Sequence, residues 1–535
     1  MAALRLITSA AYVDPELVAE FGQIPPAFLP LGVSRLYEAQ ILRFGGGAPI
    51  HLTIPAGFSP PPYDQRRLAE LGVTLVPVPE GLRLGDSIVF AINSIAASPG
   101  PVMILHGDTL IEDMPASSGD EIAVHDEGDD YSWAAVDLAG DRVTRLEVVA
   151  GGTAHESSRP VACGYFAFSD SLALVSAIAR ARGNFIAGIN LYAETRAVQA
   201  KRVTGWRDFG HIQTYFRSRC AISTARSFNT LQVDPRTVRK SSTDRNKIRA
   251  EAGWFSALPA AVQPFSARLL EAGEDRDAAF YRTEYQYAPT LAELYVFSSI
   301  GRPTWRNILR SCQEFLAACA ACKGPGSADA ALADLSVKKT MERLECYARA
   351  TGFDIDKPTR FQGHPMPSLR RIAEEMACSI DMRTGQAETL MHGDFCFSNI
   401  LYNSRAGRII VIDPRGYVQA GRPSIFGSTS YDLAKLSHSI VGCYDFILAG
   451  RYTLNQGDSH DFSIEFETDL LHDRLQRDLA ELEVGGIRSG SRTVRGIVVG
   501  LFLSMLPLHA DRPDRQAAFV ANALRLYSDL ERSRA

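Results

Sequence analysis

The sequence predicts an α/β protein built of two unlike parts, and three observations carry this prediction. Segments typical of strands and of helices alternate through the first 215 residues, which favours an open, largely parallel sheet covered by helices. A short basic segment, residues 215–226, then separates this pattern from a different one. After it come a predicted β-hairpin, a helix and a long helical region. The chain of 535 residues is long enough for three or four folding units of roughly 150 residues each.

In the first part, apolar runs predict strands and amphipathic runs predict helices. The expected strands are residues 4–7, 50–54, 73–78, 102–105 and 164–168, and the expected helices include residues 35–44 and 170–182. Ligands of open α/β sheets bind at the carboxyl ends of the strands. Asp108 follows the strand 102–105 closely and is therefore well placed to bind a metal ion. A second acid, Asp208, lies in a later Trp-Arg-Asp-Phe-Gly segment.

These segments resemble the sugar-phosphate nucleotidyltransferase family, which has a Rossmann-like fold of the GT-A type. The resemblance implies that Asp108 and Asp208 hold one Mg²⁺ ion while a phosphate oxygen attacks the α-phosphorus of a nucleoside triphosphate. Taken singly, Asp108 is also explained as a strand cap and Asp208 as a turn before a helix.

The chain departs from this family after its first strand. Where the family has a glycine-rich loop with an arginine, residues 7–14 contain no glycine and no basic side chain, and Ala27 stands where a lysine is expected. Backbone amides of glycines and basic side chains are what normally surround phosphates. Triphosphate binding must therefore use other groups, or the domain no longer transfers nucleotides.

The most informative segment of the chain is His392-Gly-Asp394, with Asn399 five positions after that aspartate and Asp413 at the end of the apolar run 409–412. Asp394 lies in a predicted loop, where its carboxylate can accept the proton of an attacking hydroxyl. Asn399 and Asp413 offer hard oxygen ligands for Mg²⁺. Each residue alone is explained as a turn or a strand end. Together, and in this order, they predict phosphoryl transfer from Mg·ATP.

This pattern resembles the aminoglycoside phosphotransferase and choline kinase family, relatives of the protein kinases. The resemblance implies that Asp394 is the catalytic base and that Asn399 and Asp413 bind the metal. His392 and Asp432 are expected to support the loop rather than to contact substrate. Three further residues, Arg415, Asp445 and His509, either face the acceptor or are surface and packing residues.

A kinase of this kind needs a small β-lobe that carries a lysine, and a helix that carries a glutamate to hold it. Residues 228–233 and 237–242 predict a hairpin with Lys240 on its second strand. Residues 244–258 predict a helix that contains Glu251. The alternative is that Lys240 and Glu251 are two solvated charges on unrelated elements.

The predicted domains are therefore a nucleotidyltransferase-like domain, residues 1–218, and a two-lobed kinase-like domain, residues 226–535. Within the second, the β-lobe is expected at about residues 226–290 and the helical lobe at about residues 291–535. Residues 324–331 are read as an ordinary flexible loop of the helical lobe.

Composition limits the class of protein. A hydrophobic content of 46%, a charged content of 22% and a net charge of −5 describe an ordinary globular chain without a basic footprint for nucleic acid. The longest apolar run, residues 497–508, is shorter than the roughly 20 residues of a membrane span. Nine cysteines, an odd number, favour reduced thiols. We expect a cytoplasmic protein whose partners are small molecules; its oligomeric state is left open.

The sequence therefore favours a bifunctional transferase. The second domain phosphorylates a small alcohol, such as a sugar, polyol or amino alcohol, with ATP and Mg²⁺. The first domain transfers a nucleotidyl group from a second NTP, with CTP or UTP expected, to that phosphate. The resemblance to such fusions implies a precursor for surface (capsular) polysaccharide. Two alternatives stay open: an active kinase with a degenerate N-terminal binding domain, and a glycosyltransferase-like N-terminal domain that uses a ready-made nucleotide sugar.

Overall fold

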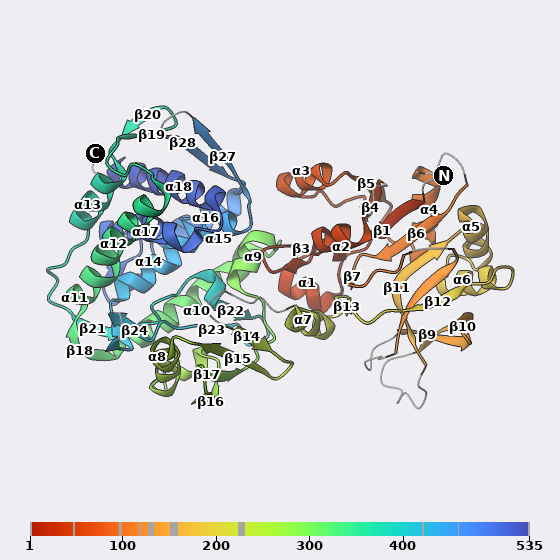
Figure 1. The fold of residues 1–535 in the computed structure, drawn as a ribbon, viewed down its shortest axis with the longest axis horizontal. Helices are drawn as coiled ribbons and strands as arrows, with labels where there is room; N and C mark the ends of the chain where they lie inside the picture. Colours follow the sequence, from red (N-terminus) through yellow and green to blue (C-terminus); the bar gives the residue numbers. More distant parts are fainter. Residues whose placement is uncertain are drawn as a thin grey trace. The chain divides into compact units, whose positions relative to one another are not determined.

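The computed structural model describes residues 3–45, 49–95, 99–116, 119–126, 133–149, 159–222, 230–419, 422–457 and 460–532. It is a mixed α/β protein whose chain divides into two compact units, Met1–Arg219 and Cys220–Ala535. Figure 1 shows the elements of each unit, coloured along the sequence. The basic segment 215–226 begins inside helix α7 (Ile212–Ala221) and is therefore partly helical, while residues 223–226 lie outside the described residues.

The first unit is built on one nine-stranded sheet. The strand order is β5 (Val73–Val78), β4 (Ile50–Pro55), β1 (Leu4–Thr8), β6 (Val102–His106), β11 (Val161–Phe168), β8 (Glu121–His125), β12 (Gln199–Arg202), β10 (Arg142–Val149) and β9 (Trp133–Ala139). Neighbours from β5 to β6 run parallel, whereas β11 is antiparallel to both β6 and β8.

This sheet is mixed rather than largely parallel. Between β6 and β11 the described residues form strands and no helix. Parallel neighbours need a long crossover, usually helical, whereas antiparallel neighbours are joined by short turns. The helix-free stretch of chain therefore pairs β9 with β10, and β8 with β11, in antiparallel fashion. Strand β8 also pairs in parallel with β12, which follows α5 and α6 in the chain. All the strands and helices expected from the sequence of this unit occur, with ends shifted by a few residues.

Helices cover the sheet, and the hydrophobic core lies between the helices and the sheet. They are α1 (Pro15–Phe21), α2 (Leu36–Phe44), α3 (Pro62–Glu70), α4 (Leu84–Ile95), α5 (Ser171–Arg180), α6 (Phe185–Ala193) and α7. The main core packs α4, α5 and α6 against the sheet through Ile88, Leu174 and Phe185. Strand β11 is buried at every position, so both of its faces are covered. Among the described residues no single helix is long and apolar enough to cross a membrane. Only the bent pair of α5 and α6 passes this test jointly, and Leu174 and Phe185 of this pair belong to the core.

The second unit begins with a four-stranded antiparallel sheet. Its order is β14 (Thr230–Val233), β15 (Thr237–Ser242), β17 (Ala279–Glu284) and β16 (Leu269–Glu274). The Asp234 carboxylate accepts hydrogen bonds from the backbone N–H groups of Arg236 and Thr237, both at 2.8 Å, and so closes the expected hairpin turn. Residues 228 and 229 of the expected hairpin lie outside the described residues. Helix α8 (Arg245–Ser256), capped by Asp244, packs against β15 and β17 (Figure 1).

The rest of the second unit is mainly helical. Its helices are α9 (Leu291–Phe297), α10 (Arg302–Ala321), α11 (Ala328–Leu332), the π-helix η3 (Ala333–Lys338), α12 (Lys339–Thr351), α13 (Leu369–Ser379), α14 (Thr429–Ile440), α15 (Tyr444–Leu448), α16 (Leu470–Ala480), α17 (Arg492–Met505) and α18 (Pro513–Arg532).

One expectation for this region is wrong. Residues 324–331 are not a loop: β18 (Lys323–Ser327) pairs with β21 (Ala387–Leu390), and α11 begins at Ala328. The glycines permit this pairing, because a Cβ at Gly324 would lie 2.6 Å from Cγ of Glu388. The N–H of Gly326 donates to Oε1 of Glu388 at 3.1 Å. Close approach, rather than flexibility, explains the glycines.

Candidate active sites

The loop that contains Asp394 lies between β21 and β22 (Ile400–Asn403), and we call residues 391–399 the Asp394 loop. Its conformation is fixed by Asp432 of α14. The N–H of His392 donates to Oδ2 of Asp432 at 2.7 Å, and the N–H of Gly393 donates to Oδ1 at 2.8 Å. Burial raises the pKa of Asp432 to about 7, and the two hydrogen bonds oppose that rise. Asp432 thus holds the loop and leaves Asp394 to other partners.

Within the Asp394 loop, the side chain of His392 is a buried, neutral ring. Burial lowers the pKa of His392 to about 4. Its Nε2 lies 3.0 Å from the carbonyl oxygen of Ile412, and its Nδ1 lies 3.3 Å from the backbone nitrogen of Asp394. The tautomer that satisfies both contacts donates from Nε2 and accepts at Nδ1. The ring therefore ties the Asp394 loop to the chain just before Asp413.

The two carboxylate oxygens of Asp394 have different partners. Oδ2 accepts from Nδ2 of Asn399 at 2.9 Å, and Oδ1 lies 2.7 Å from Nζ of Lys435 in α14. Burial by itself would raise the pKa of Asp394, but Lys435 and Arg415 lower it well below its usual range. About a third of this side chain, 34%, is exposed. Asp394 is thus an ionised, accessible carboxylate that can accept a proton from a bound hydroxyl.

A β-hairpin brings Asn399 and Asp413 together. Strand β22 pairs with β23 (Arg408–Val411) so that Ile400 faces Val411. The N–H of Ile412 donates to the carbonyl oxygen of Asn399 at 3.0 Å. Asp413 has φ of 58°, a left-handed conformation that aspartate tolerates better than most residues. The amide and the carboxylate expected to bind a metal therefore lie at the same end of this hairpin.

Lys240 and Glu251 form the expected pair, with Asp413 as a third member. Nζ of Lys240 lies 2.7 Å from Oε2 of Glu251 and also contacts Oδ1 of Asp413. The side chains of Lys240 and Glu251 are 9% and 3% exposed, so they are not two solvated charges on separate elements. Burial alone would lower the pKa of Lys240, but Asp413 and Glu251 raise it above its usual value. A charged lysine beside two carboxylates suits the binding of phosphates with a metal ion.

Helix α8, which carries Glu251, is fixed directly to this region. Nε1 of Trp254 donates to the carbonyl oxygen of Met391 at 2.8 Å. Gly416, with φ of 68°, lies so close to α8 that a Cβ there would be 2.2 Å from the carbonyl oxygen of Ala250. Neither contact was foreseen from the sequence, because each joins segments more than a hundred positions apart.

We expect Trp254→Phe to lower the free energy of unfolding more than Trp305→Phe does. Both tryptophans are buried, but only Trp254 donates a hydrogen bond within the part of the chain that the structure describes. Losing that bond leaves a buried carbonyl group unpaired, at a cost of about 1–3 kcal/mol. Urea unfolding of both variants measures the difference. Equal destabilisation would show that the hydrogen bond contributes nothing beyond the volume of the ring.

In the first unit, Asp108 and Asp208 meet although they are distant in sequence. Strand β7 (Thr109–Ile111) pairs antiparallel with β13 (Trp206–Asp208), so Asp208 faces Thr109. A Cβ built on Gly210 would lie 2.9 Å from Oδ2 of Asp108 and 3.4 Å from Oδ1 of Asp208. Both carboxylates therefore converge on this glycine, where a larger residue would displace them.

The turn that presents Asp108 is held by Gln40, a residue that the sequence did not single out. Nε2 of Gln40 donates to the carbonyl oxygens of His106, Gly107 and Thr109 at 3.1, 3.1 and 2.8 Å. Gln40 lies in α2 and is fully buried. A polar residue on the buried face of an amphipathic helix is the signal that could have revealed it.

The loop that follows β1 offers no replacement for the missing lysine and arginine. Ala27 is fully buried, and its N–H donates to Oγ of Ser9 at 3.0 Å. The nearby Arg35 is only 3% exposed in its ion pair with Asp64, at 3.1 Å, and it also donates to the carbonyl oxygen of Phe28 at 2.6 Å. This arginine therefore holds the fold of the segment and is not available to a phosphate.

Both sites suit Mg²⁺ in the chemistry of their donors, which are carboxylate and amide oxygens. No group of three or more His, Cys, Asp or Glu side chains suited to a metal occurs among the described residues. Mg²⁺ usually takes one or two carboxylates from a protein and completes its shell with water and phosphate oxygens. Asp413 with Asn399, and Asp108 with Asp208, match that smaller requirement.

The three residues considered for the acceptor have different surroundings. Arg415 lies beside the Asp394 loop, since its N–H donates to the carbonyl oxygen of His392 at 2.9 Å. Asp445 is only 3% exposed. The ring of His509 packs edge-on against Phe519, with centroids 4.9 Å apart. The packing interpretation therefore fits Asp445 and His509, and the site interpretation fits Arg415.

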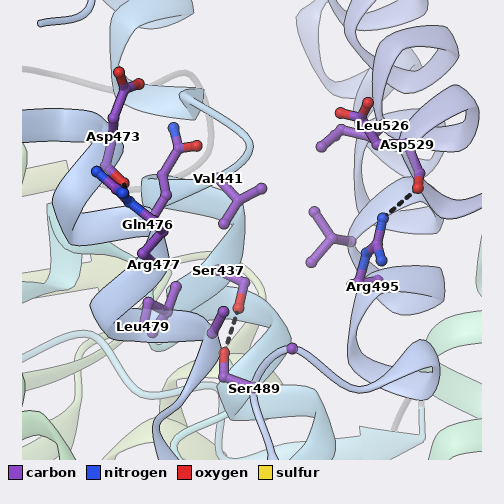
Figure 2. Close-up of a pocket in the computed structure, with 13 residues that line it drawn as sticks. Ser437, Val441, Asp473, Gln476, Arg477, Leu479, Ser489, Arg495, Leu526 and Asp529 are labelled. Atoms are coloured by element: carbon purple, nitrogen blue, oxygen red, sulfur yellow. Dashed lines mark hydrogen bonds between the residues drawn. The ribbon is translucent and has the colours of Figure 1, made fainter. Parts of the chain in front are cut away.

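A cavity of about 450 Å³ lies among α14, α16, α17 and α18. Figure 2 shows the hydroxyl groups of Ser437 and Ser489, two of its lining residues, facing each other, and they lie 2.9 Å apart. Helical periodicity places Ser437 of α14, and Val441 directly after its last residue, on the side opposite Asp432 and Lys435. This cavity is therefore separate from the Asp394 loop.

Comparison with known proteins gives similarity to solved structures only, since no family model and no curated protein matches the chain. A nucleoside-diphosphate-sugar pyrophosphorylase from Vibrio cholerae is 12% identical over 40% of this chain and 99% of its own, with a TM-score of 0.34. A UDP-glucose pyrophosphorylase from Acinetobacter baumannii is 16% identical over 41% of this chain and 93% of its own, with a TM-score of 0.33. A thermostable mutant of the aminoglycoside phosphotransferase APH(4)-Ia, in a ternary complex with ADP and hygromycin B, is 15% identical over 57% of this chain and 92% of its own, with a TM-score of 0.37. The function is therefore argued from the two sites themselves.

Proposed function

We propose that this chain is a bifunctional transferase, in which the second unit phosphorylates a small alcohol with ATP. The observation that carries the proposal is the arrangement around Asp394 and Asp413. An ionised, accessible Asp394 is held by Asn399 and Lys435, while Asp413 contacts the Lys240 that Glu251 also holds. Phosphoryl transfer is catalysed mainly by positioning and by neutralising charge, and this set of groups supplies both.

In the proposed reaction the residues of the site have different tasks. Asp394 orients the acceptor hydroxyl and accepts its proton as the oxygen attacks the γ-phosphorus, while the bond from that phosphorus to the bridging oxygen of the β-phosphate breaks and ADP leaves. Asn399 and Asp413 would hold Mg²⁺, which would supply positive charge to neutralise the phosphate oxygens. Lys240, positioned by Glu251, binds the phosphates of ATP. His392 and Asp432 keep the Asp394 loop in shape.

The assignment of Lys240 predicts a selective defect. We expect Lys240→Met to raise the KM for ATP by more than about tenfold and to lower kcat, because the phosphates lose the cation that Glu251 and Asp413 hold in place. Lys357→Met removes an exposed lysine of the same unit and serves as the matched control. Steady-state kinetics with ATP varied at saturating acceptor makes the comparison. An unchanged KM for ATP in the Lys240 variant would remove this residue from the nucleotide site.

We further propose that the first unit then transfers a nucleotidyl group from a second NTP, CTP or UTP, to the phosphorylated alcohol. Support comes from the convergence of Asp108 and Asp208 on Gly210. A product of this kind is an activated precursor, for which assembly of a surface polysaccharide is one use. The composition of residues 7–14 favours a competing hypothesis, in which this unit only binds a substrate or a nucleotide sugar.

One experiment tests the two steps in order. The full chain is incubated with ATP, Mg²⁺ and a panel of alcohols, and mass spectrometry detects an added phosphoryl group. Each phosphorylated product is then supplied with each of the four common NTPs, and pyrophosphate release is measured. A phosphorylated alcohol without any pyrophosphate would leave the kinase assignment standing and make the first unit a binding domain. Binding of a nucleotide sugar without pyrophosphate would favour the glycosyltransferase-like alternative.

A further inference from the structure

Basic side chains gather beside Asp394, and we call Lys339, Arg343, Arg415 and Lys435 the cationic cluster. Lys435 contacts Oδ1 of Asp394 at 2.7 Å and is only 10% exposed. Oδ2, in contrast, faces Asn399. The cluster therefore borders the oxygen of Asp394 that the proposed metal-binding residues do not contact.

Arg415 is fixed immediately next to Asp394. A Cβ on Gly393, the residue before Asp394, would lie 2.8 Å from Cβ of Arg415. The guanidinium carbon of Arg415 lies 5.5 Å from the centre of the Tyr431 ring. Packing against Gly393 and Tyr431 keeps this cation at the edge of the Asp394 loop.

Lys339 comes to the same place from a separate helix. It begins α12 directly after the π-helix η3, and η3 packs against β24 (Tyr417–Gln419), which starts two positions after Arg415. Arg343 follows one turn later on the same side of α12. π-Helical turns are rare and occur frequently at functional sites. Here the π-helical turn determines the direction in which Lys339 and Arg343 point from α12.

Nζ of Lys339 has no hydrogen-bond or ion-pair partner in the part of the chain that the structure describes. Burial lowers the pKa of Lys339 to about 5, and the charges of Arg415, Arg343 and Lys435 lower it further, while Asp394 opposes them. Lys339 is partly buried, and with this pKa its amine is neutral at pH 7 in the free protein, because the charged form would be partly desolvated beside other cations. An anion bound among these side chains would stabilise the charged form of Lys339.

We propose that the acceptor alcohol carries an anionic group, a carboxylate or a phosphate, which binds the cationic cluster while its hydroxyl reaches Asp394. This inference rests on the kinase function proposed above and names the class of its acceptor. A cationic acceptor would be repelled by the cluster, and a neutral one would leave Lys339 unpaired. The phosphates of ATP have their own cation in Lys240, on the side of Asp413.

Matched sets of alcohols test the acceptor class. Glycerol, glycerate and glycerol 3-phosphate form one set, and glucitol, gluconate and glucitol 6-phosphate form another. We expect kcat/KM to be at least about tenfold higher for one anionic member than for its neutral counterpart, the ratio that one charge-assisted contact provides. Preference for the carboxylate or for the phosphate identifies the group, and either result supports the proposal. Equal or better use of the neutral alcohol would overturn it and leave the kinase assignment intact.

Substitution of Lys339 tests the position of the anion. We expect Lys339→Gln to raise the KM for the preferred anionic alcohol at least about tenfold and to leave the KM for ATP unchanged. Lys338→Gln is the matched control, because it removes an exposed lysine from the neighbouring position. Equal effects of the two substitutions, or a change in the KM for ATP alone, would contradict the placement of the anion.

Calorimetry provides a readout that does not depend on turnover. Binding of the anionic alcohols without ATP is measured at pH 7 in two buffers that differ in ionisation enthalpy. An anion beside Lys339 raises its pKa from about 5, so binding should take up more protons in the wild-type protein than in Lys339→Gln. If no alcohol is phosphorylated but this linked binding occurs, the kinase function fails and the anion site stands. If none of these anions binds, the anion site is excluded.

Discussion

Asp394→Asn is expected to lower the rate of phosphorylation by about 10²–10⁴-fold, the usual contribution of a general base. The amide keeps the size of the carboxylate and one oxygen for Lys435 or Asn399, so the Asp394 loop should keep its shape. The asparagine amide, however, cannot accept a proton from the acceptor hydroxyl. ATP binding depends on Lys240, Asp413 and Mg²⁺ in the proposed mechanism and should change little. Turnover and the Kd for a non-hydrolysable ATP analogue, measured on the same preparation, separate the two effects.

The control for this substitution is Asp511→Asn, which makes the same chemical change at an exposed position of the same unit. It should keep the wild-type rate. Near wild-type turnover in Asp394→Asn would show that this residue is not the base. Loss of ATP affinity together with turnover would instead point to a damaged loop, which the thermal stability of the variant would reveal.

Much of the Asp394 site could be predicted because its main residues are close in sequence. Asp394 and Asn399 are five positions apart, and the apolar run before Asp413 is a simple strand signal. Lys240 and Glu251 follow from a hairpin and a capped helix, both of which are local patterns. Short-range turn and helix chemistry therefore specifies which groups are present and in what order.

The partners that set the charge of the site could not be predicted in this way. Lys435, which contacts Asp394, lies 41 positions after it in the sequence. Lys339 belongs to a helix that precedes the loop, 55 positions before Asp394. A lysine within an amphipathic helix looks like a solvated charge. Only packing shows that these cations are partly or fully buried and that they surround one carboxylate.

The first unit shows the same division. Individual strands and the acidic residue after β6 were recognisable, whereas the mixed order of the sheet depends on pairings between distant segments. The contacts of Gln40 with the turn around Asp108 are also tertiary. The glycines of residues 324–331 likewise predict a flexible loop when only the sequence is considered. The close approach of Glu388, which explains these glycines, depends on the fold.

The last prediction concerns the nucleotidyl step: Asp108→Ala and Asp208→Ala should each abolish pyrophosphate release and leave phosphorylation of the alcohol unchanged. Both carboxylates converge on Gly210, so we expect them to bind one metal ion together. Removing either carboxylate should therefore weaken the binding of that ion. Removing a metal ligand should lower the rate by several orders of magnitude, because the metal stabilises the charge that develops on the α-phosphate. The two units are compact by themselves, so a defect confined to one activity is the expected outcome.

Asp141→Ala provides the control, because it removes an exposed aspartate of the same unit. Pyrophosphate is measured with the phosphorylated acceptor and each of the four common NTPs, and phosphorylation is measured in parallel. Loss of transfer from only one of the two aspartates would contradict a shared metal ion. If the wild-type protein never releases pyrophosphate, the first unit is a binding domain and not a nucleotidyltransferase. The physical reason is then the loop after β1, which has no glycine and no basic residue to bind a triphosphate. Two converging carboxylates are not sufficient for nucleotidyl transfer without such groups.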